Sequence, residues 1–472
     1  MNFKTIFKSF KNKDMLRRIL IILGIIVAYR ILAHIPVPLG DPATFQDAVK
    51  NAINKTDFGG FLNLISGGGL SAFAIILVGL SPFITASIIT QLLTKAVPKL
   101  EELHNDGESG RRKINQWTRM IAVPLAILQS VAYIFILYNQ VVTQGTAIAI
   151  EPSTADWVLS ITAMSAASIL LMWLGELITE QGVGNGISMI IFASIISGLP
   201  NTLSGLGQSL FNTENGSLSL FGWFNLPVDP TVFFIILGFA VALIVVLYFL
   251  VKINEAQRVI TINYAKRVRG NTSYGGIKSI LPIKLIAAGV IPVIFAVAFL
   301  SLPAFVGQIL KSADPSNQLA ANLVNWFSAP NQNNFYTLYP NGITAAWFIY
   351  PVVYFLLVVG FTYFYTSIIF NTKEISENLQ KQGGFIEGVR PGAKTAEYLG
   401  KTVTRLNLFG SLALGLIAML PFITDYIFIV IAGQPIGLSL SGTGLLIVVT
   451  VALENLRQLN SRALMVTYDD YQ

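Results

Sequence analysis

The sequence contains no cysteine and only two histidines, and these shortages restrict the chemistry that the chain can perform. Without cysteine it can form no disulfide, no thiolate nucleophile and no Cys-ligated metal site. His34 and His104 lie far apart in the sequence, which argues against a multi-histidine metal centre. We therefore expect neither a metal nor a cofactor.

Charged residues are also scarce. They make up 12% of the chain, whereas a soluble domain carries about a quarter. The hydrophobic residues, 53% of the sequence, are grouped in long uncharged runs that are typical of a membrane protein. These runs offer no acid–base pair, and a serine nucleophile would lack a histidine partner. We predict that the chain is not an enzyme.

Ten apolar segments approach the length needed to cross a bilayer core, which takes about 20 residues of helix. They predict an all-α polytopic membrane protein with ten transmembrane helices. The fifth and tenth segments are short and rich in glycine, so their ends are the least defined. The predicted spans lie near residues 19–37, 70–93, 120–138, 157–177, 186–200, 231–251, 285–303, 344–370, 406–423 and 438–453.

Ten spans divide into two groups of five, and an odd number in each group makes the second half run inverted. Such inverted halves commonly enclose a path at their interface. The two halves show no convincing sequence identity, so the prediction rests on the number of spans alone. The predicted order is a cytoplasmic N-terminus (1–18), an N-terminal half (19–200), an external loop (201–230), a C-terminal half (231–453) with cytoplasmic loops near 252–284 and 371–405, and a cytoplasmic tail (454–472).

Lysine and arginine are distributed unequally between the two sides that these spans define. Of the 31 basic residues, all but Lys50, Lys55, Lys311 and Arg30 fall in the N-terminus, the tail and the loops after spans 2, 6 and 8. Because basic loops stay in the cytoplasm, both termini are predicted to be cytoplasmic. The long loops after spans 6 and 8 are either folded projections that a partner contacts or basic segments that only fix the topology.

A short apolar segment, residues 57–66, precedes three consecutive glycines and then the second span. It is far too short to cross a membrane. Glycine permits the sharp reversal that a re-entrant segment needs, so 57–66 is a candidate for such a segment. The alternative is an amphipathic piece that lies on the outer membrane surface.

The second span carries a proline and two polar residues. Pro82 is expected to bend the helix because proline leaves a carbonyl without its donor. Leu80, Ile84 and Gln91 are spaced to share one helix face. Thr85 and Gln91 are polar at membrane depth, where such residues usually face protein or water rather than lipid. Ordinary helix packing is the alternative for each of them.

Two acids, Glu176 and Glu180, and a Gly-x-Gly-x-Gly turn at 182–186 join the fourth and fifth spans. The spacing of the glycines is similar to that of a phosphate-binding loop. However, no strand precedes them, and the Lys-Ser/Thr pair of such a loop is absent, so we do not expect nucleotide binding. The acids fit a helix end or a contact between loops.

The segments Gly67–Gln91 and Trp173–Ser188 resemble, in this order, the two signature stretches of the SecY/Sec61 channel family. The resemblance covers nearly the whole chain, and the loop pattern fits the bacterial members best. It continues through residues 29–38 (YRILAHIPVP), 108–113 (ESGRRK), 288–292 (AGVIP), 388–392 (GVRPG) and 442–448 (GTGLLIV).

This resemblance implies a polypeptide channel whose two five-helix halves surround a path that is closed at its waist by apolar side chains. An apolar ring holds neither ions nor water, and it grips a sliding chain without sequence preference. The first ring position is often Ile in relatives and is Leu here. By motif match the ring consists of Leu80, Ile84, Ile187, Ile191, Ile294 and Ile447.

The resemblance also implies a plug, which is a short re-entrant helix under the ring, and a lateral gate between spans 2 and 7. Through this gate a hydrophobic segment would pass into lipid. On span 2 the gate residues would be Thr85 and Gln91. The plug would match 57–66, with the apolar side chains Phe58, Phe61, Leu62, Leu64 and Ile65.

The implied function is that of the central channel of the Sec translocon, which passes unfolded secretory polypeptides across the bacterial plasma membrane and releases membrane segments into lipid. The implied partners are SecE, SecG, the SecA motor ATPase, the ribosome, and preproteins with their signal sequences. Basic side chains suit rRNA phosphates or an acidic motor surface. The contacts implied by motif match are Arg258, Lys266, Arg267, Arg269 and Arg390.

Other functions remain open at this point. A specialised accessory translocase of the same family is compatible with the sequence. A secondary transporter would need charged or strongly polar residues at the midplane, and spans 2 to 10 carry almost no charge away from their ends. A membrane enzyme such as an intramembrane protease would need a catalytic set, which is missing.

Overall fold

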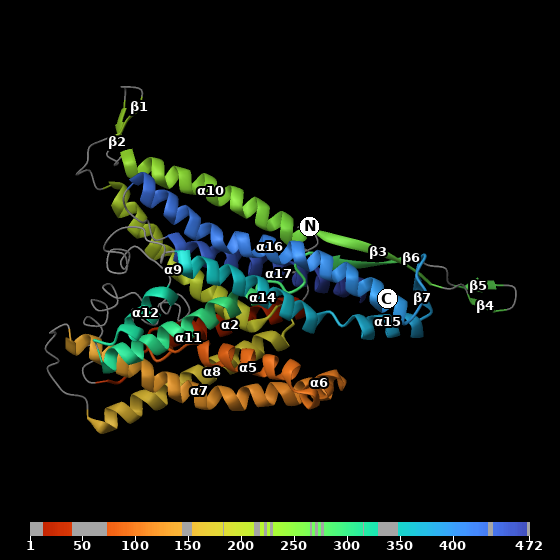
Figure 1. The fold of residues 1–472 in the computed structure, drawn as a ribbon, viewed down its shortest axis with the longest axis horizontal. Coiled ribbons are helices and arrows are strands. Elements are labelled where there is room, and N and C mark those ends of the chain that lie inside the picture. The colour runs from red at the N-terminus through yellow and green to blue at the C-terminus, as the bar shows by residue number, and fades with distance from the viewer. Residues whose placement is uncertain are drawn as a thin grey trace. The chain divides into compact units, whose positions relative to one another are not determined.

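The structure is a computed structural model of the 472-residue chain, and it is mostly helical (Figure 1). It describes residues 13–39, 73–143, 153–182, 184–211, 218–220, 224–226, 230–264, 267–269, 272–274, 278–314, 316–328, 348–432 and 438–469. The chain forms two compact units. Unit 1 comprises Met1–Phe239, Val297–Tyr350 and Pro421–Gln472, and unit 2 comprises Ala240–Ala296 and Pro351–Leu420.

Unit 1 is built from helices that pack side by side, with α5 against α7, α7 against α8 and α8 against α9 (Figure 1). Its elements are α2 (Lys13–Leu32), α5 (Ser81–Ala96), α6 (Pro98–Asn105), α7 (Gly107–Thr143), α8 (Thr154–Glu180), α9 (Gly186–Phe211), the hairpin β1 (Leu218–Leu220) and β2 (Phe224–Leu226), α12 (Gln318–Phe327) and α17 (Leu438–Asp469). Helices with residues in both units are α10 (Pro230–Glu255), α11 (Ile291–Ala313), α14 (Ile349–Ile369) and α16 (Ala393–Ala432).

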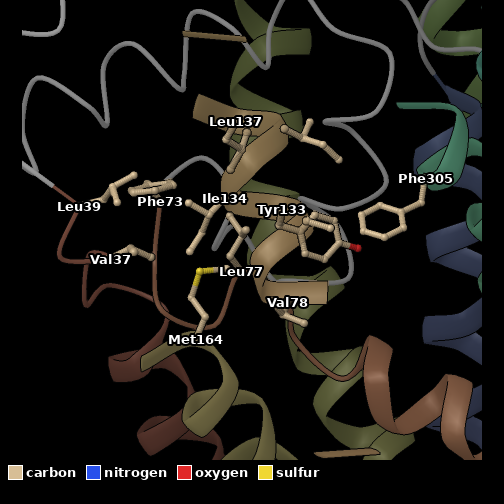
Figure 2. Packing of buried hydrophobic residues seen from close by; sticks show 12 residues of the cluster. Val37, Leu39, Phe73, Leu77, Val78, Tyr133, Ile134, Leu137, Met164 and Phe305 are labelled. Atoms are coloured by element: carbon tan, nitrogen blue, oxygen red, sulfur yellow. The ribbon is translucent and has the colours of Figure 1, made fainter. Parts of the chain in front are cut away.

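The core of unit 1 joins segments that are distant in sequence (Figure 2). Val37 and Leu39, from the stretch after α2, pack with Phe73 and with Ile134 of α7. The Tyr133 and Phe305 rings meet with centroids 4.9 Å apart at 56°. Because lipid tails are as apolar as these side chains, close packing rather than exclusion of water holds such a cluster together within the membrane.

Small polar residues let the helices of unit 1 approach closely. Ser165 of α8 donates to the Ser130 hydroxyl of α7 over 3.1 Å, and Ser168 of α8 donates to the Gly79 carbonyl over 2.7 Å. These hydroxyls are buried, and their hydrogen bonds satisfy groups that would otherwise be costly at membrane depth.

Every one of the ten predicted spans contains helix. Within the described residues, six helices are long and apolar enough to cross a membrane: Gly107–Asn139, Thr154–Glu180, Ile236–Glu255, Ile291–Ala313, Ile349–Lys381 and Ala393–Ile423. The helices at the first, second, fifth and tenth predicted spans fall outside these criteria. The count of ten therefore stays a prediction, as does the division into two inverted halves.

The second predicted span differs from its expected form. Residues 73–80 form turns, and helix begins only at Ser81. Pro82 therefore lies in the first turn of α5 and does not bend a continuous helix, so that expectation was wrong. The physical reason is that proline lacks only an N–H group that has no helical partner in the first turn, and its φ angle already suits a helix. Gly79, with φ of 58°, provides the left-handed turn before it.

Unit 2 contains a three-stranded antiparallel sheet with the order β6-β3-β7. Its strands are β3 (Gln257–Tyr264), β6 (Lys278–Lys284) and β7 (Gly384–Ile386), and the small hairpin β4 (Arg267–Arg269) and β5 (Thr272–Tyr274) falls between β3 and β6 in the chain. The helix α15 (Thr372–Lys381) packs against β7. Both long loops therefore contain folded elements, and contact with a partner stays a prediction.

Candidate functional site

The glycine-rich turn between α8 and α9 is a tight hairpin. Gly182 has a φ of 68°, which turns the chain at the end of α8. The Asn185 side chain caps α9 by accepting from the Ile187 and Ser188 amides at 3.0 and 3.3 Å. Thr179 Oγ1 accepts from the Gly186 amide at 2.9 Å. These hydrogen bonds define the turn and the start of α9.

Glycine also sets how closely α8 and α9 approach. A Cβ placed at Gly186 would lie 1.8 Å from the Gly175 carbonyl oxygen, so only glycine fits there. A Cβ at Gly175 would touch the Ile187 side chain at 3.4 Å. Ile187 and Ile191, two of the predicted ring residues, follow one turn apart on α9, and Ile191 is buried. The close packing at the hairpin therefore fixes the position of the first turns of α9, which carry Ile187 and Ile191.

Leu80 and Ile84 occupy the beginning of α5. Leu80 is its N-cap, and the Ile84 amide donates to the Leu80 carbonyl over 3.0 Å. The two residues lie four apart on one face, as predicted, and both are buried. The helix start at Ser81 places these two predicted ring residues beside a break in regular structure rather than in the middle of a long helix.

The last two predicted ring residues lie on α17 and α11. Ile447 is buried on α17, which packs against α9, so the structure brings the helices of Ile447, Ile187 and Ile191 together. Ile294 lies on the first turn of α11, in unit 2, and is partly buried. None of the six side chains carries a donor or an acceptor.

The predicted gate residues on α5 differ in their surroundings. Thr85 is buried. Gln91 donates from Nε2 to the Ser87 hydroxyl over 3.0 Å, one turn earlier. Its Oε1 is enclosed, and no hydrogen bond reaches it from the described part of the chain. A buried amide oxygen without a donor costs roughly 1–3 kcal/mol, so Oε1 of Gln91 would gain from a donor.

The predicted plug, including Phe58, Phe61, Leu62, Leu64 and Ile65, lies outside the described residues. The structure does describe both ends of the segment that contains it. The Val37 amide donates to the Phe73 carbonyl over 2.8 Å, and the Ile75 amide donates to the Ile35 carbonyl over 2.9 Å. We call this pairing of 35–37 with 73–75 the clamp.

The clamp is held within the core of unit 1. Ser160 of α8 donates to the Pro38 carbonyl over 3.0 Å, and Phe73 is completely buried in the cluster of Figure 2. Phe73 also has a φ of 45°, in the left-handed region that side chains other than glycine avoid. Such a conformation persists only where its surroundings impose it.

The predicted motor and ribosome contacts lie in the folded loops of unit 2. Arg258, on β3, and Arg390, between β7 and α16, are both exposed. Arg267 and Arg269 are the first and last residues of β4, and Lys266 lies outside the described residues. The Arg390 carbonyl accepts from Thr395 Oγ1 at 2.9 Å, and Gly388 and Gly392 on either side have positive φ angles, so the turn that carries Arg390 is well defined.

The sheet that supports these arginines has one buried face. Ile260 pairs with Leu281, and Ile262 pairs with Ile386 on the other side of β3. These side chains pack on Leu399 of α16. Because side chains alternate along a strand, the opposite face carries Val259 and Ile280, which are exposed.

Glu176 forms an ion pair with Arg119, which accounts for an acidic residue at this position. Its Oε1 lies 2.7 Å from Nε of Arg119 on α7, in a pair that is partly exposed. Arg18 of α2 donates to the Gln181 carbonyl at the α8–α9 turn over 2.9 Å. Glu176 and Arg119 both lie in helices, so the ion pair joins α8 to α7 and is not a contact between loops, whereas Arg18 ties the turn to α2. In the described part of the chain, no group of three His, Asp or Glu residues could hold a metal ion.

Sequence reasoning missed two residues of this site. Asn455 of α17 donates to the Met189 sulfur of α9 over 3.1 Å. Asn455 follows the last predicted span, and in the sequence it is indistinguishable from other polar residues of the predicted tail. Phe73 was hidden inside a predicted span. A strained backbone and a contact across 266 positions leave no local signal in the sequence.

Known proteins resemble this chain over almost its full length. The family model named SecY matches residues 74–456. The protein translocase subunit SecY of Streptomyces coelicolor is 36% identical over 469 residues, which cover 98% of each chain. That of Corynebacterium glutamicum is 37% identical over 471 residues, with the same coverage.

Solved structures agree on the fold. A protein-conducting channel matches with a TM-score of 0.60 at 19% identity, over 93% of this chain and 91% of that one. Canine Sec61 in a ribosome–channel complex matches with a TM-score of 0.56 at 18% identity, over the same fractions. The fold is therefore that of a multi-pass channel protein.

Proposed function

Since the chain belongs to the SecY family, we propose that it is the channel subunit of a bacterial protein translocase, which passes unfolded polypeptides across the plasma membrane and releases hydrophobic segments into lipid. One observation carries this proposal: relatives that are 36% identical over 98% of the chain are protein translocase subunits. Family membership also agrees with the prediction that the chain is a channel and not an enzyme.

The closed state would depend on the apolar ring. Its side chains offer no hydrogen bonds to water or ions, so a narrow passage between them would empty of water and block leakage. A polypeptide passing through would meet only non-directional contacts, which accept any sequence. The proposed ring residues are Leu80, Ile84, Ile187, Ile191, Ile294 and Ile447. The plug, at 57–66, would add a second barrier on the external side.

The lateral gate would use Thr85 and Gln91 on α5. The enclosed Oε1 of Gln91 lacks a donor within the described residues, and water entering an opened gate would supply one. Opening beside α5 would hydrate this oxygen and expose the path to lipid. A hydrophobic segment of about 20 residues would then partition into the bilayer. Gln91 would therefore favour opening.

The proposed partners are SecE and SecG in the membrane, and SecA or the ribosome at the sheet of unit 2. The exposed arginines Arg258 and Arg390 support a contact there with an acidic surface or with rRNA. Arg267, Arg269 and Lys266 would extend the same contact. Nearly all of the lysines and arginines fall in the predicted cytoplasmic segments, which supports a cytoplasmic position for both termini.

Reconstitution tests the function directly. The chain would be placed in liposomes with a SecE-type partner, and SecA, ATP and a signal-bearing preprotein would be added. ATP-dependent protection of the preprotein from protease is the expected result. Solute uptake without motor binding or preprotein protection would instead indicate a transporter, and motor binding without protection would indicate a specialised translocase.

The ring is tested in the same liposomes by recording ion conductance. Replacing Ile187, Ile191 and Ile294 by Ser would let water wet the waist, so we expect a leak that the wild type lacks. Matched serine substitutions at exposed positions of α10, Val241 and Val245, should leave the conductance unchanged. Protection of the preprotein without any added leak in the ring variant would refute the ring assignment and leave the translocase function intact.

A further inference from the structure

From the contacts between α9 and α17, we infer that Asn455 is a positioning residue for the ring: it holds the α8–α9 hairpin against α17 and so fixes Ile187 and Ile191 relative to Ile447. The inference rests on the proposed function. It assigns a role to a residue that lies two turns beyond the last predicted ring residue, Ile447, on the same helix.

The first observation is a hydrogen bond between the two helices. Asn455 Nδ2 donates to the Met189 sulfur over 3.1 Å. Met189 lies on α9 between Ile187 and Ile191, so the bond is made at the level of the ring residues of that helix. Asn455 lies eight residues after Ile447 on the same continuous helix, α17. Because helices are stiff over two turns, fixing one end fixes the other.

The second observation is a close approach at the hairpin. A Cβ placed at Gly184 would lie only 2.1 Å from Oδ1 of Asn455. The amide of Asn455 therefore rests directly on the backbone of the turn, while its nitrogen reaches Met189. The Asn455 side chain thus makes two contacts. One is with the turn that precedes α9, and the other is with Met189 in the first turn of α9. Two contacts define both the distance and the orientation of the helix.

The relative position of α9 and α17 matters because the barrier to ions depends on the width of the apolar ring. An apolar passage stays dry only while it is narrow, and a small displacement of α9 would widen it and admit water. The hairpin is also held by Arg18, whose guanidinium donates to the Gln181 carbonyl. Asn455 binds the hairpin from α17. Unlike the Arg18 contact, the Asn455 contact joins two helices that carry predicted ring residues, α9 and α17.

The test uses a substitution that creates a clash and a second one that removes it. Gly184→Ala would displace the Asn455 amide, because the new methyl group would lie 2.1 Å from its Oδ1, and would so break its contacts with the turn and with Met189. We expect the conductance of the closed channel in liposomes to rise roughly tenfold, which corresponds to about 1.4 kcal/mol of lost preference for the closed state. Asn455→Ala removes both contacts, so we expect it to leak to a similar degree. The double variant should leak no more than Asn455→Ala alone, because the side chain that the new methyl group would displace is then absent.

The matched control is Gly198→Ala, also on α9, where a Cβ would meet nothing within 4 Å. It should behave as the wild type. Ile187→Ser serves as the positive control for a leak, and translocation of a preprotein shows that each variant is folded and assembled.

Three outcomes decide the matter. A leak in Asn455→Ala that the added Gly184→Ala does not increase supports the positioning role. Tight closure of Asn455→Ala while Ile187→Ser leaks, or a double variant that leaks more than Asn455→Ala, overturns it and leaves the translocase function untouched. Tight closure of Ile187→Ser overturns the ring assignment and the positioning role with it. Loss of translocation in the wild type would contradict the proposed function itself.

Discussion

At the scale of single residues, Phe73 combines features that rarely occur together. Its backbone is in the left-handed region, where a side chain is strained by roughly 1–2 kcal/mol, and yet its ring is completely buried. The strain is tolerated because the ring packs in the core of unit 1 while its carbonyl accepts from Val37. Phe73 therefore stabilises the clamp through its side chain and its backbone together.

Replacing Phe73 by Ala should destabilise the protein by about 3 kcal/mol, because the ring leaves a cavity while alanine keeps the strained backbone. The measurement is the thermal unfolding midpoint of the purified protein in detergent. Leu319→Ala is the control, since Leu319 of α12 is 72% exposed and should change the midpoint little. Equal midpoints for the two variants would show that the clamp does not depend on this ring.

At the scale of elements, glycines decide which helices can touch. A Cβ at Gly415 of α16 would lie 2.8 Å from the Phe355 ring of α14 and 3.2 Å from Val359. Both helices contribute these residues to unit 2. Gly400 lies on the same helix, and a Cβ there would meet nothing within 4 Å. The pair offers a comparison of one substitution in two environments.

Gly415→Ala should therefore destabilise unit 2 by about 2 kcal/mol through overpacking against Phe355. Gly400→Ala should be neutral or slightly stabilising, because alanine favours an exposed helix. Unfolding followed by urea titration in mild detergent distinguishes them. A smaller loss of stability in Gly415→Ala than in Gly400→Ala would contradict the packing described for α14 and α16.

The sheet of unit 2 allows a similar comparison on one strand. Ile260 of β3 points into the buried face, and Val259 beside it points outward. Ile260→Asn would bury an amide without partners, at a cost of about 3 kcal/mol, whereas Val259→Asn should be nearly neutral. We expect rapid proteolysis of the loop and loss of SecA-driven translocation only in Ile260→Asn. Resistance of that variant to protease would show that the sheet does not depend on this core.

The sequence predicted the helices of the long apolar runs well, since hydropathy over about 20 residues is a strong local signal. It did not predict the turns at 73–80, because a run of apolar residues looks the same whether its backbone is helical or not. The pairing of β3 with β7 joins residues about 120 positions apart. β7 has only three residues and gives no strand signal of its own, so its pairing with the eight-residue β3 could not be predicted from the sequence.

At the scale of the whole molecule, the absence of cysteine makes the predicted orientation easy to test. Single cysteines can be introduced without a background of native thiols. With both termini in the cytoplasm, Arg258→Cys on β3 should react with an impermeant maleimide only from the cytoplasmic side. Asn322→Cys, on the exposed face of α12, should react only from outside. The reverse pattern in oriented membrane vesicles would invert the topology.

The clamp has a further consequence for how such a chain can evolve. The residues that flank the stretch from 40 to 72 are bonded to each other in the clamp, so this stretch starts and ends at neighbouring points of the fold. Closing a flexible insert of twice the length costs only about 0.6 kcal/mol more. Insertions and deletions there should be accepted readily, and a lineage could remodel this stretch for its own cargo while every helix around it stays in place.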